Sequence, residues 1–325
     1  MSNAALINCS HPHYNLGLAK YANHLVAQGW RIEMQRRPPG PLFASDYALV
    51  AFSAIFSWDV PALIAGVNQV RGRAGKVEIG GPGTLTLAEY IEQQTGIAPV
   101  QGLDVRFEQE PGMYAQTFTT RGCPSACPWC IVPRLEGRRI VEYLDFNPAP
   151  VVLDNNILAA SVEHQERVVE RLLREGYPEV DFNSGFDARL FDEAAYERFS
   201  PLPLKCWRFA FDESSRGTAV RDALLLLRSR RDARPRRVYV LAGNEPLEAC
   251  LERALKVIAW GAEPFVQPLQ PLDALHKNTY TPPGWEPGRL TDFARYFNRY
   301  IWRRVPWPEY DRHYRARRMD YTTIK

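Results

Sequence analysis

The sequence predicts an α/β protein with three parts: an N-terminal parallel-sheet domain, a partial (βα)6 barrel and a C-terminal extension. Two observations lead to this prediction. Short apolar runs alternate with stretches of helical periodicity over residues 1–275, which is the order typical of parallel sheets covered by helices. A Pro-Pro-Gly break at 282–284 then interrupts the alternation. We expect the three parts to cover residues 1–110, 111–275 and 276–325.

In the first part, three apolar segments are predicted as strands, at residues 5–9, 47–52 and 76–79. Helical periodicity predicts helices at 16–28, 61–70 and 88–94. Within the apolar stretch 49–67, Asp59 and Pro61 favour the start of a helix, which argues against a membrane-spanning segment. The alternation of strand and helix predicts a Rossmann-like domain with a parallel sheet.

The second part repeats the same alternation six times. The predicted strands lie at 114–119, 150–153, 180–182, 206–211, 238–241 and 264–268, and the clearest helices at 161–175, 218–229 and 245–260. Six such units suffice for a partial TIM-type barrel. In barrels of this type the chemistry takes place at the C-terminal ends of the strands.

Composition fits a folded, water-soluble protein. The chain has 325 residues, of which 46% are hydrophobic and 24% charged, and its formal net charge is only +3. This size fits two or three domains, and the small charge identifies no partner. The N-terminus lacks the basic and apolar regions of a secretory signal. We therefore expect a cytoplasmic protein without a membrane partner.

Three of the six cysteines are crowded into eight residues: Cys123, Cys127 and Cys130, spaced CxxxCxxC. A disulfide framework would be spread more evenly, so the crowding indicates a metal site. Three thiolates on a [4Fe–4S] cluster leave one iron free to bind a ligand. The alternative is zinc, which usually takes four ligands in pairs, and the sequence has no second pair.

This motif, placed after the first strand of a βα repeat, resembles that of radical SAM enzymes. The resemblance spans roughly residues 1–275. It implies that the open iron binds S-adenosylmethionine (AdoMet), whose reductive cleavage yields a 5′-deoxyadenosyl radical that abstracts hydrogen from a substrate. It also implies a reducing partner such as a flavodoxin or ferredoxin, and it places Trp129 near the adenine.

Polar residues after the predicted strands are further candidates for AdoMet binding, with ordinary turns or surface ion pairs as the alternative. They are Asn155, Asn183, Asp187, Arg189, Asp212, Glu213, Gly243 and Asn244. The remaining cysteines, Cys9, Cys206 and Cys250, are expected in the core. Cys206 is also the one candidate for a catalytic thiol, because it lies on a predicted barrel strand.

The N-terminal domain resembles the cobalamin-binding domain that precedes many radical SAM barrels. Residues 15–22 resemble the start of its first helix, and the turn with Gly80, Gly81 and Gly83 resembles its Gly-Gly-Pro-His turn, with Gly83 in place of the histidine. Glycines let a backbone approach a ligand closely. The resemblance implies cobalamin as a possible cofactor, and a scaffold without cobalamin is the alternative.

Residues 276–325 carry eleven Lys and Arg against five Asp and Glu, and aromatic residues alternate with the arginines. This composition suits contact with nucleic acid, and it equally suits an amphipathic segment packed on the barrel. The substrate could therefore be a nucleotide or nucleic acid. The alternatives to a radical SAM enzyme of unknown substrate are a cobalamin-dependent methyltransferase, a nucleic-acid-modifying enzyme, an iron–sulfur electron carrier, and a nucleic-acid-binding protein with a structural metal.

Overall fold

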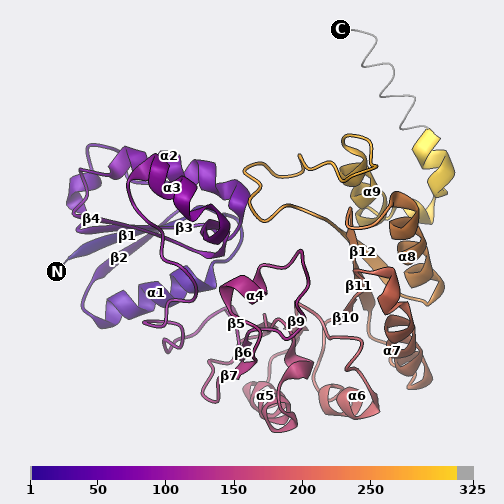
Figure 1. Cartoon of the computed structure of the whole chain (residues 1–325). Helices are drawn as coiled ribbons and strands as arrows, with labels where there is room; N and C mark the ends of the chain where they lie inside the picture. The colour runs from indigo at the N-terminus through magenta and orange to yellow at the C-terminus, as the bar shows by residue number, and fades with distance from the viewer. Residues whose placement is uncertain (1, 313–325) are drawn as a thin grey trace.

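The computed structural model describes residues 2–312 and has a mixed α/β architecture with parallel sheets (Figure 1). The first sheet has the order β2-β1-β3-β4, and every neighbouring pair in it is parallel. Its strands are β1 (Asn3–Asn8), β2 (Arg31–Gln35), β3 (Leu49–Ser53) and β4 (Lys76–Gly80). The three strands expected in this part of the chain are confirmed within two residues at each end.

Helices cover both faces of this sheet. Leu6 of β1 packs with Leu18 and Leu25 of α1 (Leu16–Ala27) on one face. Ile7, its neighbour in the strand, packs on the other face with residues of α2 (Val60–Val70) and α3 (Ala88–Thr95). Alternate burial of this kind follows from the two-residue period of a strand. The three predicted helices are therefore confirmed.

The second half contains two three-stranded parallel sheets, β5-β8-β9 and β10-β11-β12. Two isolated parallel bridges, Val180↔Leu204 and Phe186↔Phe209, join their neighbouring edges. The strands therefore run side by side in chain order. They are β5 (Gln116–Thr117), β8 (Val151–Val152), β9 (Asp181–Phe182), β10 (Trp207–Ala210), β11 (Arg236–Ala242) and β12 (Glu263–Pro268).

Helices alternate with these strands and bury one large apolar cluster against them. They are α5 (Val162–Glu175), α6 (Glu193–Phe199), α7 (Gly217–Ser229) and α8 (Leu247–Ala259). Between β5 and β8 lie the antiparallel pair β6 (Thr120–Arg121) and β7 (Val141–Glu142) and the short helix α4 (Val132–Leu135). The cysteine motif occupies the segment between β6 and α4.

Helix α9 and the described residues that follow it pack onto the second half of the molecule. Phe293 and Phe297 of α9 (Arg289–Asn298) belong to its apolar cluster, together with Trp307. The Asn298 side chain accepts from the backbone N–H of Val266 and donates to its carbonyl oxygen, both at 2.8 Å, so α9 completes the exposed edge of β12. Of the aromatic residues that alternate with the arginines of this segment, Trp307 is buried and Trp302 and Tyr310 are half-buried.

This packing favours the amphipathic interpretation for the part of the segment that the structure describes. Tyr300 is exposed, and it lies against the side chain of Arg303, which itself pairs with Glu263 at the end of the sheet. Tyr314, Arg315, Arg317, Arg318 and Lys325 lie outside the described residues. Among the helices of residues 2–312, none combines the length and hydrophobicity that crossing a bilayer requires.

Candidate metal and cofactor site

A glycine and a buried acid set the start of the cysteine loop. Gly122 has φ +83°, and a Cβ at this position would lie 2.0 Å from the carbonyl oxygen of Arg139, so the chain needs glycine immediately before Cys123. Glu136 accepts hydrogen bonds from the backbone N–H of Gly122 (2.9 Å) and from the side chain of Asn155 (2.7 Å). These contacts tie the loop to the residues that follow β8.

Asp154 holds the backbone just before the cysteine loop. Its Oδ1 accepts from the backbone N–H groups of Thr119 (2.6 Å) and Thr120 (2.9 Å), and its other oxygen accepts from the Thr119 hydroxyl. The Asp154 side chain is buried, and burial raises its pKa to about 6, although these hydrogen bonds act in the opposite direction. His164 contacts the Thr119 hydroxyl from α5.

The three cysteines line one cavity of about 940 Å³. Six of the nine residues expected to bind AdoMet line it too: Trp129, Asn155, Asn183, Asp187, Arg189 and Asp212. They come from the cysteine loop and from the residues that follow β8, β9 and β10. The structure thus brings together side chains from four separate chain segments, at the carboxyl ends of the strands.

The other three candidates, Glu213, Gly243 and Asn244, do not line this cavity. Glu213 accepts a hydrogen bond from Arg216. A Cβ on Gly243 would lie 2.8 Å from Pro282, so this glycine serves packing between β11 and the segment before α9. Asn244 donates to the backbone oxygen of Asp212 (2.6 Å), which holds the turn after β10.

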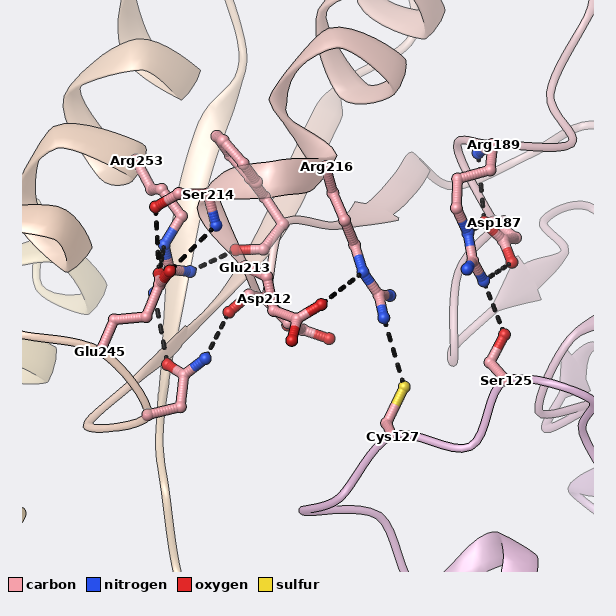
Figure 2. Close-up of polar contacts among 12 residues, drawn as sticks. Ser125, Cys127, Asp187, Arg189, Asp212, Glu213, Ser214, Arg216, Glu245 and Arg253 are labelled. Atoms are coloured by element: carbon pink, nitrogen blue, oxygen red, sulfur yellow. Dashed lines mark hydrogen bonds and ion pairs between the residues drawn. The ribbon is translucent and has the colours of Figure 1, made fainter.

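Two arginines reach toward the cysteine loop from different elements (Figure 2). Arg216, just before α7, has its Nη2 3.5 Å from the Sγ of Cys127. Arg189 donates to the Ser125 hydroxyl (2.6 Å) while it pairs with Asp187 (2.6 Å), so the expected ion pair exists and stands at the cavity wall. Sequence reasoning missed Arg216, whose position next to Cys127 depends on a contact across 89 residues.

Two buried polar atoms on the cavity wall have no hydrogen-bond partner in the structure. They are Oδ1 of Asn156 and Nε2 of Gln270. Asn156 is only 4% exposed, and its Nδ2 donates to Asp187 (2.9 Å). Buried polar atoms are rarely left unpaired, so these two atoms are suited to contact a ligand in the cavity.

Burial by itself favours the neutral form of a thiol. Burial raises the pKa of the Cys130 thiol, although a backbone hydrogen bond from Val132 acts in the opposite direction. A thiol so placed becomes a thiolate only beside a strong positive partner, such as iron or zinc. As the side chains stand, no three or more His, Cys, Asp and Glu residues within 2–312 form a group that could hold a metal ion. The case for a cluster therefore depends on the motif and on the cavity that its cysteines share.

Sequence reasoning missed His13, whereas Cys206 is buried as expected of a core residue. His13 lines the cysteine cavity, although it lies far from the motif in sequence, and its ring packs against Phe56 at 5.1 Å. Cys206 is buried and lines neither this cavity nor the one at the edge of the first sheet, and burial raises the pKa of its thiol. The structure therefore supports a core role for Cys206 rather than a catalytic one.

A second cavity, of about 420 Å³, lies at the carboxyl edge of the first sheet. Gly80 and Gly81 line it, whereas Gly83 does not. A Cβ on Gly81 would lie 2.3 Å from the carbonyl oxygen of Ala54, and one on Gly83 2.4 Å from the carbonyl carbon of Phe56. These two glycines are thus required by the close approach of the chain to itself.

Comparison with known proteins assigns the chain to no family. No family model matches the chain, and no curated protein matches it in sequence.

Proposed function

We propose that this chain is a radical SAM enzyme that holds a [4Fe–4S] cluster on Cys123, Cys127 and Cys130 and cleaves AdoMet reductively. The observation that carries the proposal is the shared cavity: three cysteines spaced CxxxCxxC face the same space as polar side chains from three strand ends. When bound, the cluster supplies one electron to AdoMet, and C5′–S cleavage generates the radical that takes hydrogen from a substrate.

The strand order supports this proposal. Six parallel strands follow one another in chain order with helices between them, as expected for a partial (βα)6 barrel. The cavity lies at their carboxyl ends, where barrels of this kind hold their ligands. Its volume of about 940 Å³ falls within the range of small-molecule and cofactor sites.

The residues on the wall suit the parts of AdoMet. Arg189 and Arg216 offer guanidinium groups to the methionine carboxylate beside the cysteines. Asn183 and Asp212 provide acceptors and donors for the ribose hydroxyls, and Trp129 offers a ring face to the adenine. Burial raises the pKa of Asp212, and the charges of Arg216 and Arg253 act in the opposite direction. We further propose that a small flavodoxin or ferredoxin reduces the cluster.

Cobalamin fits the structure less well. A cavity of about 420 Å³ encloses a drug-sized ligand, and cobalamin is far larger than such a ligand. Gly81 and Gly83, which suggested a ligand turn, pack against the chain itself. The proposal therefore includes no step that depends on cobalamin.

Anaerobic reconstitution tests the cluster assignment. The protein should take up about four iron atoms per chain. The electron paramagnetic resonance signal of the reduced cluster should shift when AdoMet is added, because AdoMet binds the open iron. A cluster whose signal does not change when AdoMet is added would favour the electron carrier instead. Binding of one zinc ion in place of iron and sulfide would contradict both the radical SAM enzyme and the electron carrier.

A further inference from the structure

The second cavity lies beside the first and has different chemistry. The first sheet, the segment 100–108 and the base of the cysteine loop all contribute to its wall. Its apolar lining includes Leu16, Phe52, Phe56, Ile79, Leu103 and Phe107. His13, Phe56 and Asn183 line both cavities, so the two are adjacent.

Each acid on the wall of this apolar cavity is already paired. Glu78 is held by Lys76 and by the Tyr21 hydroxyl, both at 2.6 Å. Asp104 pairs with Arg106, whose Nε lies 2.9 Å from the carboxylate.

Arg121 neutralises the remaining two acids. It contacts Glu108 through Nε (2.7 Å) and Glu136 through Nη1 (3.0 Å). Lys20 adds a second cation at Glu108. A charged ligand would have to compete with these pairs, at the cost of leaving its own charge or a carboxylate unpaired.

The two cavities therefore suit two different molecules. The cysteine cavity carries the guanidinium group of Arg216 and the unpartnered polar atoms of Asn156 and Gln270, which match a zwitterionic ligand with ribose hydroxyls. The apolar cavity offers aromatic and aliphatic surface and neutralised acids, which match an uncharged ligand. Its volume of about 420 Å³ limits that ligand to a small molecule.

We propose that the apolar cavity binds the second substrate of the enzyme and that this substrate is a small, uncharged, largely apolar organic compound. The substrate role rests on the proposed function, whereas the preference for an uncharged ligand rests on the cavity alone. A nucleic acid is disfavoured, because the cavity has no free cation among residues 2–312 to meet a phosphate, and because Trp307 is buried and Trp302 and Tyr310 are half-buried against the apolar cluster.

Two fluorescent probes with the same ring system test this proposal in the full-length protein. N-phenylnaphthylamine is neutral, and anilinonaphthalene sulfonate adds a negative charge. The neutral probe should bind saturably, at about one molecule per chain, and the sulfonate at least roughly tenfold more weakly. Absence of saturable binding by the neutral probe, or equal binding of the two, would overturn the proposal.

Matched variants locate the binding. Leu103→Trp fills the cavity and Leu103→Asp places an unpaired charge in it, so each should weaken the neutral probe at least roughly tenfold. Val105→Trp and Val105→Asp make the same changes two residues away, where the side chain is 87% exposed and off the cavity, and should change the affinity less than about twofold. Equal losses of probe affinity in the Leu103 and Val105 variants would overturn the assignment of the probe to the apolar cavity. Unchanged iron loading and melting temperature would verify that the Leu103 variants fold.

AdoMet distinguishes this proposal from the proposed function. In the reconstituted protein AdoMet should bind while the neutral probe stays bound. Displacement of the probe by AdoMet, or by a short single-stranded RNA, would overturn the assignment of a separate apolar substrate site. If AdoMet does not bind but the Leu103 variants still lose probe binding, the proposed function and the substrate role are overturned. The preference of the apolar cavity for an uncharged ligand would then still stand.

Discussion

In the four-stranded sheet, β1 pairs with β2 and with β3 over five residues each, and apolar side chains on both faces pack under helices. Around the cysteine loop, by contrast, β5, β8 and β9 are only two residues long. Side chains replace part of the backbone hydrogen bonding there. Asp154 and Glu136 accept from backbone N–H groups of residues 119, 120 and 122, which lead into the loop. The geometry of the site therefore depends on a few buried charges, whereas the first sheet depends on many small apolar contacts.

The largest effect should come from the loop itself. Cys127→Ala removes one of three cluster ligands and should abolish iron loading, because two thiolates cannot hold the cluster. Cys206→Ala is the matched control, since that thiol is buried away from both cavities, and it should load iron normally. Iron and sulfide analysis of both reconstituted variants checks this. Normal loading in Cys127→Ala would refute the ligand assignment.

The next effect concerns the buried charges. Arg121→Gln leaves Glu108 and Glu136 without their shared cation, and breaking a buried ion pair costs about 3–5 kcal/mol in the free energy of unfolding. Arg174→Gln breaks the exposed pair with Glu170 and should cost less than about 0.5 kcal/mol. Denaturant unfolding measures both. Similar losses in the free energy of unfolding for the two variants would mean that the buried charges do not set the stability of this region.

Asp154 should make that stability depend on pH. Its pKa is raised from 3.8 to about 6 in the folded state, so the native protein binds the proton more tightly than the unfolded chain. This contribution is full below about pH 4 and is lost as the pH rises to about 6. Asp154→Asn resembles the protonated form, so it should gain stability relative to the unmodified protein over this range, by about 3 kcal/mol.

Unfolding of both proteins by urea across this pH range provides the measurement. A difference in the free energy of unfolding that does not change with pH would show that Asp154 has an ordinary pKa.

The smallest effect is expected at His13, which is the one histidine on the wall of the cysteine cavity within the described residues. If three cysteines alone hold the cluster, His13→Ala should change iron loading by less than about 10%. The electron paramagnetic resonance shift with AdoMet should also persist. Loss of the cluster in this variant would identify His13 as a fourth ligand and would favour the electron carrier.

The sequence predicts the elements whose apolar residues stand out as a run or a clear period, and it misses elements without such a pattern. The edge strand β2 (Arg31–Gln35) is largely exposed and has no apolar run, so it carried no periodic signal. Helix α9 was missed because arginines and aromatic residues concealed its apolar face, which includes Phe293 and Phe297.

For the site, residues at strand ends could be predicted because parallel strands bring their carboxyl ends together, as for Asn155, Asn183 and Asp212. The contact of Arg216 with Cys127 and the place of His13 on the same wall depend on tertiary packing, so no local pattern indicates them. The turn with Gly80, Gly81 and Gly83 also differs from the predicted ligand turn. A Cβ on Gly83 would meet the backbone of Phe56 rather than open space.

The most direct test of AdoMet cleavage by this protein is the search for 5′-deoxyadenosine. The reconstituted protein is mixed with dithionite and AdoMet without oxygen, and the products are separated by chromatography. Reductive cleavage of AdoMet by this protein should give 5′-deoxyadenosine and methionine in equal amounts from the unmodified protein and none from Cys127→Ala. A protein that carries the cluster and binds AdoMet at it, but forms no 5′-deoxyadenosine with any uncharged compound that occupies the apolar cavity, would contradict it.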